Sequence, residues 1–418
     1  MSEMSEKKGE MIQTQEIWEQ GQKLQNWLVQ VRRDFHRYPE LSTQEFQTRD
    51  RIINYLQEMG LEVQTDFPNL GVVGIINGTA KSQSNDDQVK EAEAVALRAD
   101  MDALPLEDAK SVPYKSQNPG VTHACGHDAH ITILLGAASI LTQIRHKFSG
   151  QIKLIFQPAE ETVGGAKPMI DAGVLEKPKV KSIFGLHVAP DLPLGTIGVK
   201  YDQMNASSDT ISIKIKGKRG HGAYPHESRD AITASAQVIS ALQTITSRNV
   251  NPLKSAVISL GTIQGGTQHN VIAGEVAMTG TVRTLDPETR QYVLSRVKTT
   301  VEAITQGLDT KGEVFIEEGY PPLINDEIMT NLVLSKGKEL LGDENVRVET
   351  SPTMGVEDFS YFLEQSSGTF YKLGCANKDQ NEVYPIHNEF FDINEDCLSV
   401  GTVLQALNAI TALQSSQN

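Results

Sequence analysis

The segment HACGHDAHITILLGAASIL, which begins at His123, brings a thiol and an imidazole close together in the sequence. Gly126 alone separates Cys125 from His127, and the apolar run that follows has helical spacing, with Asp128 placed to cap that helix. Thiolates and imidazoles are common ligands of transition metals, and a turn at a helix start would present both to one ion. A buried structural thiol beside a capping region fits the same residues. The segment alone leaves both interpretations open.

Acidic side chains and another histidine follow short apolar runs elsewhere in the chain. Asp100 and Asp102 come after Ala94 to Leu97, Glu160 and Glu161 after Ile152 to Phe156, and His187 at the end of Ser182 to Leu186. In α/β sheets the residues beyond the carboxyl ends of strands form the usual site of binding and catalysis. Adjacent glutamates are usually a solvated surface feature, but these two lie between an apolar strand and a glycine turn, which favours exposure to a cleft.

Such a set of side chains suits the hydrolysis of an amide. One bound metal ion lowers the pKa of water, and a second stabilises the oxyanion that forms when water attacks the carbonyl. Of two adjacent glutamates, one can bind metal while the other moves a proton from the water to the leaving amine.

Alternating strands and helices are expected to position these residues. Apolar spacing predicts helices from Ile17 to Arg33 and from Thr48 to Met59. Buried strands of a mixed sheet are predicted at Gly71–Ile76, Ala94–Leu97, Ile152–Phe156 and Ser182–Leu186. The polar stretch from Ala80 to Glu93 has no periodicity and is expected to form a solvated loop.

After Met204 the pattern changes to that of a separate α+β unit. Strands are predicted at Thr210–Lys216, Ala256–Ile263, Glu275–Val282 and Val314–Glu318, with helices at Asp230–Ser247 and Pro287–Gln306. The predicted fold is therefore α/β. A catalytic domain of residues 1–203 and 317–418, with a mixed central sheet flanked by helices, would hold an inserted α+β domain at 204–316.

The amino-acid composition limits which kinds of molecule the protein could bind and where it could act. The 418 residues carry a formal net charge of -15, which would repel nucleic acid and anionic membrane. The N-terminal sequence has no apolar core typical of a signal peptide, and no stretch reaches the roughly 18 apolar residues of a membrane span. The three cysteines are too few and too odd in number for a disulfide framework. A cytoplasmic protein acting on a small molecule is expected.

With these residues considered together, the sequence resembles the M20 metallopeptidase family, in the branch of aminoacylases, hippurate hydrolases and auxin-amino-acid conjugate hydrolases. The resemblance covers nearly the whole chain. Its markers, in order, are RRDFHRYPELS, LRADMDALPLED, THACGHDAH, FQPAEET, GLHVAP, GKRGHGAYPH, QHNVIAG, GTVRT and GVEDFSYF. One such motif alone would be weak, whereas their common order makes coincidence improbable.

The resemblance implies hydrolysis of N-acyl amino acids at a site with two divalent metal ions per chain, zinc or manganese. The positions that match the family's metal ligands are Cys125, His127, Glu161, His187 and His387, with Cys125 between the metals. A metal-bridging hydroxide would be the nucleophile, and Glu160 matches the general acid and base. Asp102 matches an aspartate that supports the site.

The inserted domain would contribute the remaining site residues. His221 matches a histidine that helps to hold the oxyanion, while Asn270 and Arg283 match residues that bind the polar end of the substrate. Arginine suits a carboxylate because its planar donors bind two oxygens at once. The resemblance also implies that this domain closes over the site or forms a homodimer, and it leaves open whether His221 acts within its own chain or on its neighbour.

Other residues of the same types have no assigned role. More distant branches carry histidine at the position of Asp100, so Asp100 is left outside the set of ligands. Packing or capping is expected for the remaining six of the ten histidines, which are His36, His123, His130, His146, His226 and His269. His226 and His269 also remain candidates for the pocket. Cys375 and Cys397 are expected in the core.

Three alternatives stay open. The same metals and general base would serve an N-acetyl-diamino-acid deacetylase of biosynthesis, from which only the substrate pocket would differ. A catalytically silent binding scaffold would be expected to have lost the glutamate or the ligands. A nucleotide-binding protein is suggested by the glycine segments GTIQGG and TVGGAK, but neither has the spacing of a phosphate loop.

Overall fold

The computed structural model describes residues 13–80, 94–376 and 383–415. The loop expected at residues 80–93 therefore lies, except for Ala80, outside the described residues. The chain divides into two compact units. The first comprises Met1–Asp202, Asn325–Thr350 and Tyr361–Asn418, and the second comprises Gln203–Ile324 and Ser351–Ser360. The predicted insertion at 204–316 lies inside the second unit.

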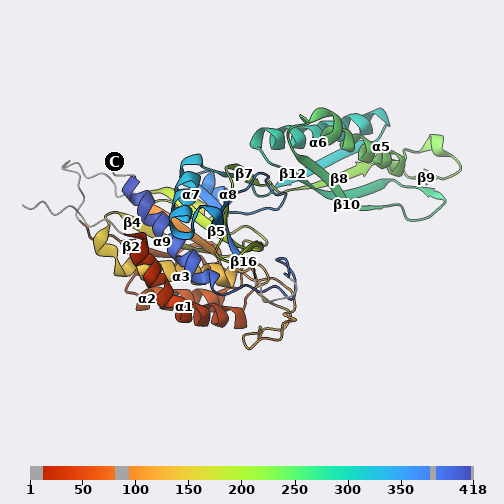
Figure 1. Ribbon diagram of the computed structural model, residues 1–418. Coiled ribbons are helices and arrows are strands. Elements are labelled where there is room, and N and C mark those ends of the chain that lie inside the picture. Colours follow the sequence, from red (N-terminus) through yellow and green to blue (C-terminus); the bar gives the residue numbers. More distant parts are fainter. Residues whose placement is uncertain (1–12, 81–93, 377–382, 416–418) are drawn as a thin grey trace, which may run out of the picture. The chain divides into compact units, whose positions relative to one another are not determined.

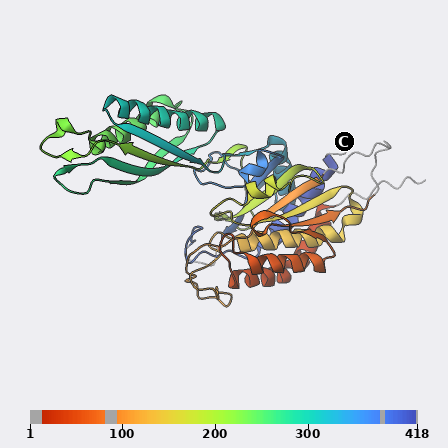
Figure 2. The same ribbon diagram turned by 180° about the vertical axis from the view of Figure 1, so that it is seen from behind.

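A mixed sheet of eight strands forms the centre of the first unit, as the sequence predicts (Figures 1 and 2). Its order is β1-β2-β4-β3-β5-β16-β6-β15. The strands are β1 (Glu62–Gln64), β2 (Val72–Asn77), β3 (Ala94–Asp100), β4 (Gln151–Gln157), β5 (Val180–Pro193), β6 (Ile197–Val199), β15 (Val346–Val348) and β16 (Ser367–Ala376). Because β4, β3 and β5 are parallel neighbours, their carboxyl ends meet at one edge of the sheet.

Helices of the first unit pack on this sheet and on one another. They are α1 (Thr14–Arg37), α2 (Phe46–Glu58), α3 (His127–Gln143), α4 (Ala166–Asp171), α7 (Glu327–Leu341), α8 (Ser360–Leu363) and α9 (Cys397–Ser415). Helix α3 is apolar on nearly all sides and is buried between the sheet and helices α1 and α9. Close packing requires glycine at Gly136, where an added Cβ would lie 2.5 Å from the Thr402 hydroxyl of α9.

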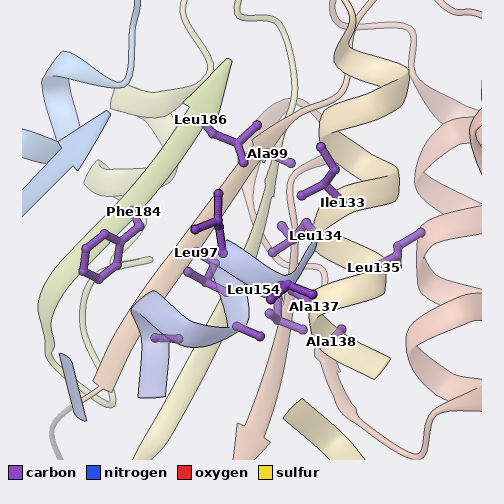
Figure 3. Packing of buried hydrophobic residues seen from close by; sticks show 14 of the residues in the cluster. Leu97, Ala99, Ile133, Leu134, Leu135, Ala137, Ala138, Leu154, Phe184 and Leu186 are labelled. Atoms are coloured by element: carbon purple, nitrogen blue, oxygen red, sulfur yellow. The ribbon is translucent and has the colours of Figure 1, made fainter. Parts of the chain in front are cut away.

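The core of the first unit joins the strands to helix α3. Leu97 of β3, Leu154 of β4 and Phe184 of β5 are fully buried. Figure 3 shows these side chains with Leu134 and Ala137 of α3 in the same cluster. Burying apolar surface contributes about 25 cal/mol per Å², so this core fixes helix α3 on the strands that carry the candidate site.

Helix α9 is the one helix of the described residues that is long and apolar enough to cross a membrane by length and composition. However, 89% of its apolar window is buried inside the protein. Its apolar surface therefore packs into the core. Cys397, the first residue of α9, and Cys375 of β16 are buried free thiols, as the sequence predicts.

The second unit is an α+β structure whose antiparallel sheet has the order β10-β12-β8-β13. Its strands are β8 (Asp209–Lys216), β10 (Ala256–Gly265), β12 (Glu275–Thr284) and β13 (Lys311–Glu318). Helices α5 (Ala231–Thr244) and α6 (Pro287–Gly307) lie side by side against it (Figure 1). Ile211, Ile213 and Ile215 alternate with more exposed residues, which is the pattern of a sheet covered on one face.

Short elements complete the two units. The small strands are β7 (Asp202–Asn205) with β14 (Leu323–Asn325), and β9 (Gly220–His221) with β11 (Val271–Ile272). The 3-10 helices are η1 (Pro68–Leu70), η2 (Arg145–Lys147), η3 (Pro225–Glu227) and η5 (Asp343–Asn345), and the π-helix η4 (Ile245–Asn249) continues α5.

Candidate metal centre and active site

The candidate site of the first unit lies where β3, β4 and β5 approach the start of helix α3. Asp100 pairs in register with Gln157, three residues before Glu160, and Arg98 pairs with Gly185, two residues before His187. The sequence predicts that the strand before His187 ends at that residue. This prediction is wrong, because β5 continues through His187 to Pro193 while β16 extends the sheet beside it.

Gly126 brings the turn that carries Cys125 and His127 against β5. Its φ of 90° lies in the left-handed region, and an added Cβ would lie 2.3 Å from Cγ2 of Val188. Only glycine therefore allows this approach. The prediction that Asp128 caps α3 is wrong: Gly126 is the cap residue, and Asp128 lies within the first turn of the helix.

The first group of candidate ligand atoms belongs to Cys125, His127 and His187, and these atoms lie within 4.8 Å of one another. Sγ of Cys125 is 3.3 Å from Nε2 of His187. Nδ1 of His187 donates a hydrogen bond to the Val188 carbonyl at 2.8 Å, which leaves the lone pair of Nε2 directed at the thiol. Burial lowers the pKa of His187 to about 3, so this imidazole is neutral and can act as a ligand.

The second group consists of Cys125, Glu161 and His387, also within 4.8 Å of one another. Nε2 of His387 lies 3.3 Å from Oε1 of Glu161, and the same oxygen lies 3.8 Å from Nε2 of His127. The His387 N–H donates to the Ala124 carbonyl at 2.8 Å, which ties its loop to the residue before Cys125. Cys125 thus belongs to both groups, which is the arrangement that a bridging thiolate requires.

Several buried polar atoms of this site lack a hydrogen-bond partner in the part of the chain that the structure describes, which indicates that divalent cations fit here. Both ring nitrogens of His127 and Oε1 of Glu161 are buried without a hydrogen-bond partner among the described residues. Such atoms cost about 1–3 kcal/mol each unless something satisfies them. Burial raises the pKa of the Cys125 thiol well above its ordinary value, and the charges of Glu161 and Glu160 raise it further. A divalent cation would satisfy these atoms and stabilise the thiolate.

Asp102 supports the site through its contacts with residues around it. Its Oδ1 lies 3.3 Å from Nδ1 of His127 and accepts the Glu160 N–H at 3.1 Å. Its Oδ2 accepts the Glu161 N–H at 3.0 Å and the Ser42 hydroxyl at 2.6 Å. Burial raises the pKa of Asp102, but His127, Ser42 and the Glu161 amide together outweigh burial and the net shift is downward. The carboxylate therefore orients the imidazole and the turn that holds both glutamates.

His130 and Asp100 form a supporting pair that the sequence analysis left without a role. Nδ1 of His130 lies 2.6 Å from Oδ1 of Asp100, and its Nε2 accepts the Val188 N–H at 3.0 Å. Both nitrogens are occupied, so His130 packs against His127 and His187 without a lone pair for a metal. His127 and His130 are three positions apart in the sequence, which places both on one helical face. This spacing could have indicated that their two rings pack together.

A buried ion network explains why Asp128 does not cap α3. Arg32 of α1 binds Asp128 at 2.8 Å, Asp392 at 2.8 Å and Glu395 at 3.3 Å. His36, also on α1, contacts Asp128 at 2.7 Å. The carboxylate of Asp128 thus neutralises a fully buried guanidinium. The network fixes the residue after His127 to the segment that follows His387.

His221, a candidate catalytic residue, and the candidate substrate-binding residues Asn270 and Arg283 lie in the second unit. His221 of β9 pairs with Val271 of β11, and the Gly222 N–H donates to the Asn270 carbonyl at 2.8 Å, so His221 and Asn270 lie close together. Nδ1 of His221 accepts the Ala223 N–H at 3.1 Å, which directs the ring proton to Nε2. Arg283 lies on β12, and its guanidinium donates to the Val282 carbonyl at 3.3 Å.

Comparison with known proteins agrees with this chemistry. Residues 96–409 match the model of peptidase family M20/M25/M40. N-acetyl-L-cysteine deacetylase of Bacillus subtilis is 40% identical over 90% of this chain and 85% of its own length. IAA-amino acid hydrolase ILR1-like 4 of Arabidopsis thaliana is 38% identical over 91% of this chain and 84% of its own length.

A solved structure shows the same fold. The crystal structure of the Bacillus subtilis YXEP protein, a dinuclear metal-binding peptidase of the M20 family, is 34% identical. It covers 94% of this chain and 99% of its own, with a TM-score of 0.80. The ligand-type residues gathered around Cys125, together with similarity over nearly the whole length, establish that the chain belongs to peptidase family M20/M25/M40 and is an amide hydrolase.

Proposed function

We propose that this enzyme hydrolyses the amide bond of N-acyl amino acids, of the aminoacylase, hippurate or indole-acetyl type. The observation that carries the proposal is Cys125, whose thiol is shared by two groups of ligand atoms beside the adjacent Glu160 and Glu161. The two named relatives support the substrate class, since one is a deacetylase of an N-acetyl amino acid and the other a hydrolase of IAA-amino acids.

Cys125, His127, Glu161, His187 and His387 would hold two divalent ions. When bound, such ions polarise the substrate carbonyl and lower the pKa of the attacking water. Thiolate and imidazole ligands suit zinc, while the carboxylate is compatible with manganese. Glu160 is the residue we assign to proton transfer: it takes a proton from the water and gives it to the leaving amine. The products are the carboxylic acid and the free amino acid.

The remaining assigned residues position either the catalytic groups or the substrate. Asp102 holds the turn of Glu160 and orients His127. We assign His221 to the developing oxyanion, and Asn270 and Arg283 to the carboxylate of the amino acid. With these three assignments, residues of the second unit must reach the metals. We therefore assign this unit the role of a lid or of a homodimer contact. Three buried free cysteines support a reducing compartment such as the cytoplasm.

A substrate panel tests this proposal. The metal-loaded enzyme is assayed with N-acetyl, N-benzoyl and indole-acetyl amino acids, an N-acetyl diamino acid, and a dipeptide with a free amine. We expect an N-acyl α-amino acid to exceed the dipeptide in kcat/KM by at least about tenfold. Replacing its carboxylate with a carboxamide should raise KM, because Arg283 would lose its partner.

The Glu160→Gln variant, prepared in the same way, controls for a contaminating hydrolase. Preference for the free dipeptide, or equal turnover by Glu160→Gln, would overturn the proposal. Preference for the N-acetyl diamino acid would move the substrate to the biosynthetic deacetylase class.

A further inference from the structure

The turn that carries Glu160 has a backbone that needs support. It begins at Pro158, immediately after β4, and Ala159 has a φ of 57°, which is unfavourable for a residue with a Cβ. A Cβ at Gly165 would lie 1.9 Å from the Pro158 carbonyl, so the chain folds tightly back on itself here. Strained turns of this kind persist where surrounding groups hold them.

Acidic side chains from two other segments accept hydrogen bonds from three successive N–H groups of this turn. Oε1 of Glu45 accepts the Ala159 N–H at 2.9 Å. The next two N–H groups, of Glu160 and Glu161, donate to the two oxygens of Asp102 at 3.1 and 3.0 Å. Asp102 also contacts His127, whereas the hydrogen bond of Glu45 to this turn involves no candidate ligand.

Glu45 occupies a position where its side chain would ordinarily serve its own helix. It is the N-cap residue of α2, yet its side chain makes no capping hydrogen bond. The amides of Gln47 and Thr48 are instead bound by Glu40, at 3.2 and 2.8 Å. The side chain of Glu45 is directed at the turn of Glu160, and its exposed fraction is 0%.

The burial of Glu45 is energetically costly, which argues that its contact with Ala159 is useful. Its Oε2 has no hydrogen-bond partner among the described residues. Burial, with the nearby charge of Asp102, raises the pKa of Glu45 to about 8. An apolar side chain would avoid this cost but would leave the Ala159 N–H without its acceptor.

We propose that Glu45 is a positioning residue for Glu160, acting through its hydrogen bond from the Ala159 N–H. The inference rests on the proposed role of Glu160 in proton transfer. Glu45 fixes the residue before Glu160, while Asp102 fixes Glu160 and Glu161 themselves. Loss of the Glu45 contact should displace the Glu160 carboxylate relative to the water and leave the ligands in place.

The test compares Glu45→Leu, Glu45→Gln and the wild-type enzyme. Glu45→Leu should lower kcat by about tenfold or more, since small displacements of a reacting group have effects of that size. KM should stay within about twofold and the metal content should be unchanged, because the ligands and substrate contacts remain. Glu45→Gln keeps an oxygen acceptor for Ala159 and should restore most of kcat. Amide exchange at Ala159 should accelerate in Glu45→Leu and remain slow in Glu45→Gln.

Glu40→Leu is the matched control, because it weakens the start of the same helix without contacting the turn. It should lower the unfolding midpoint while kcat stays near that of the wild type. Wild-type kcat in folded Glu45→Leu, or a loss of kcat that Glu45→Gln does not restore, would overturn the positioning role. Loss of metal in parallel with kcat would also overturn it. Full activity in Glu160→Gln would instead refute the proposed function itself, so the two failures are distinguishable.

Discussion

The side chain of Cys125 is the centre of the candidate site at the scale of single residues. It shares one group of ligand atoms with His127 and His187, and another with Glu161 and His387. Its neighbours are oriented by bonds made elsewhere, such as the Nδ1 contact of His187 with the Val188 carbonyl. This contact gives His187 a defined direction without using Nε2, the atom that would bind metal.

Substitution of the ligands should therefore change metal content before it changes the fold. We expect the wild-type chain to bind up to two ions, Cys125→Ser to weaken the binding of both, and His187→Ala to weaken one. Elemental analysis after dialysis measures the ions per chain, and circular dichroism reports the fold. Unchanged occupancy and activity in both variants would show that the ions bind elsewhere.

Glu160 and Glu161 are adjacent but should respond differently to the same substitution. Glu160→Gln should keep the metal and lose turnover by about 10² or more, because it removes the general base. Glu161→Gln should lose metal as well, since its Oε1 faces both His127 and His387. Equal metal loss in the two variants would contradict this division of roles.

At the scale of elements, Arg32 joins α1 to α3 and to the segment before α9 through buried ion pairs. Burial raises the pKa of Asp128 and of Asp392, but the Arg32 charge together with other neighbours, His36 among them, outweighs burial and holds both pKa values below the ordinary carboxyl range. Carboxylates of this kind stabilise the fold above the unfolded pKa of about 4 and lose that contribution as pH falls.

Arg32→Met should thus destabilise the fold most at neutral pH. We expect a loss of about 3–5 kcal/mol at pH 7, because two buried carboxylates lose the cationic guanidinium that compensates their charge. The difference from the wild type should shrink as pH falls below about 4 and the carboxylates become protonated. Urea unfolding of the metal-free proteins from pH 3 to 7 measures this.

Fluorescence is a suitable probe for this experiment, because the two tryptophans of the chain, Trp18 and Trp27, both lie on α1. Arg33→Met is the matched control. Arg33 pairs with Glu395 from a side chain that is 39% exposed, so its loss should have a small effect. A difference for Arg32→Met that stayed constant with pH, or grew toward acid, would contradict the proposed linkage.

At the scale of the whole molecule, the assigned residues divide between two units. The ligands and Glu160 belong to the first unit, while His221, Asn270 and Arg283 belong to the second. If all of them serve one reaction, turnover depends on the second unit reaching the metals, either in the same chain or from a neighbouring one.

His221→Ala should accordingly lower kcat by about 10² and leave the metal content intact, as loss of an oxyanion donor does. Mixing inactive His221→Ala and Glu160→Gln chains under conditions of subunit exchange separates the two routes. Recovered activity would show that His221 acts on the neighbouring chain. Absence of recovery in confirmed mixed dimers would restrict its action to its own chain, and a fully active His221→Ala would remove its role.

The sequence by itself determined the mixed α/β architecture, the position of most helices and strands, and the segments that carry Cys125, His127 and Glu160. These features are readable because apolar periodicity and the glycine of a tight turn act over a few neighbouring residues. It also determined the family, since ordered motifs along nearly the whole chain are a property of the sequence alone.

Only the tertiary structure decided which distant residues meet. Asp100 pairs with His130, Arg32 binds Asp128, and Glu45 reaches Ala159, and these contacts join residues 30, 96 and 114 positions apart. Local patterns assigned Asp128 to a cap and His130 to packing because a side chain's strongest partner, here a buried charge, lies far away in sequence. The burial that makes such charges costly is created by the folded core, and so no local spacing reveals how they are paired.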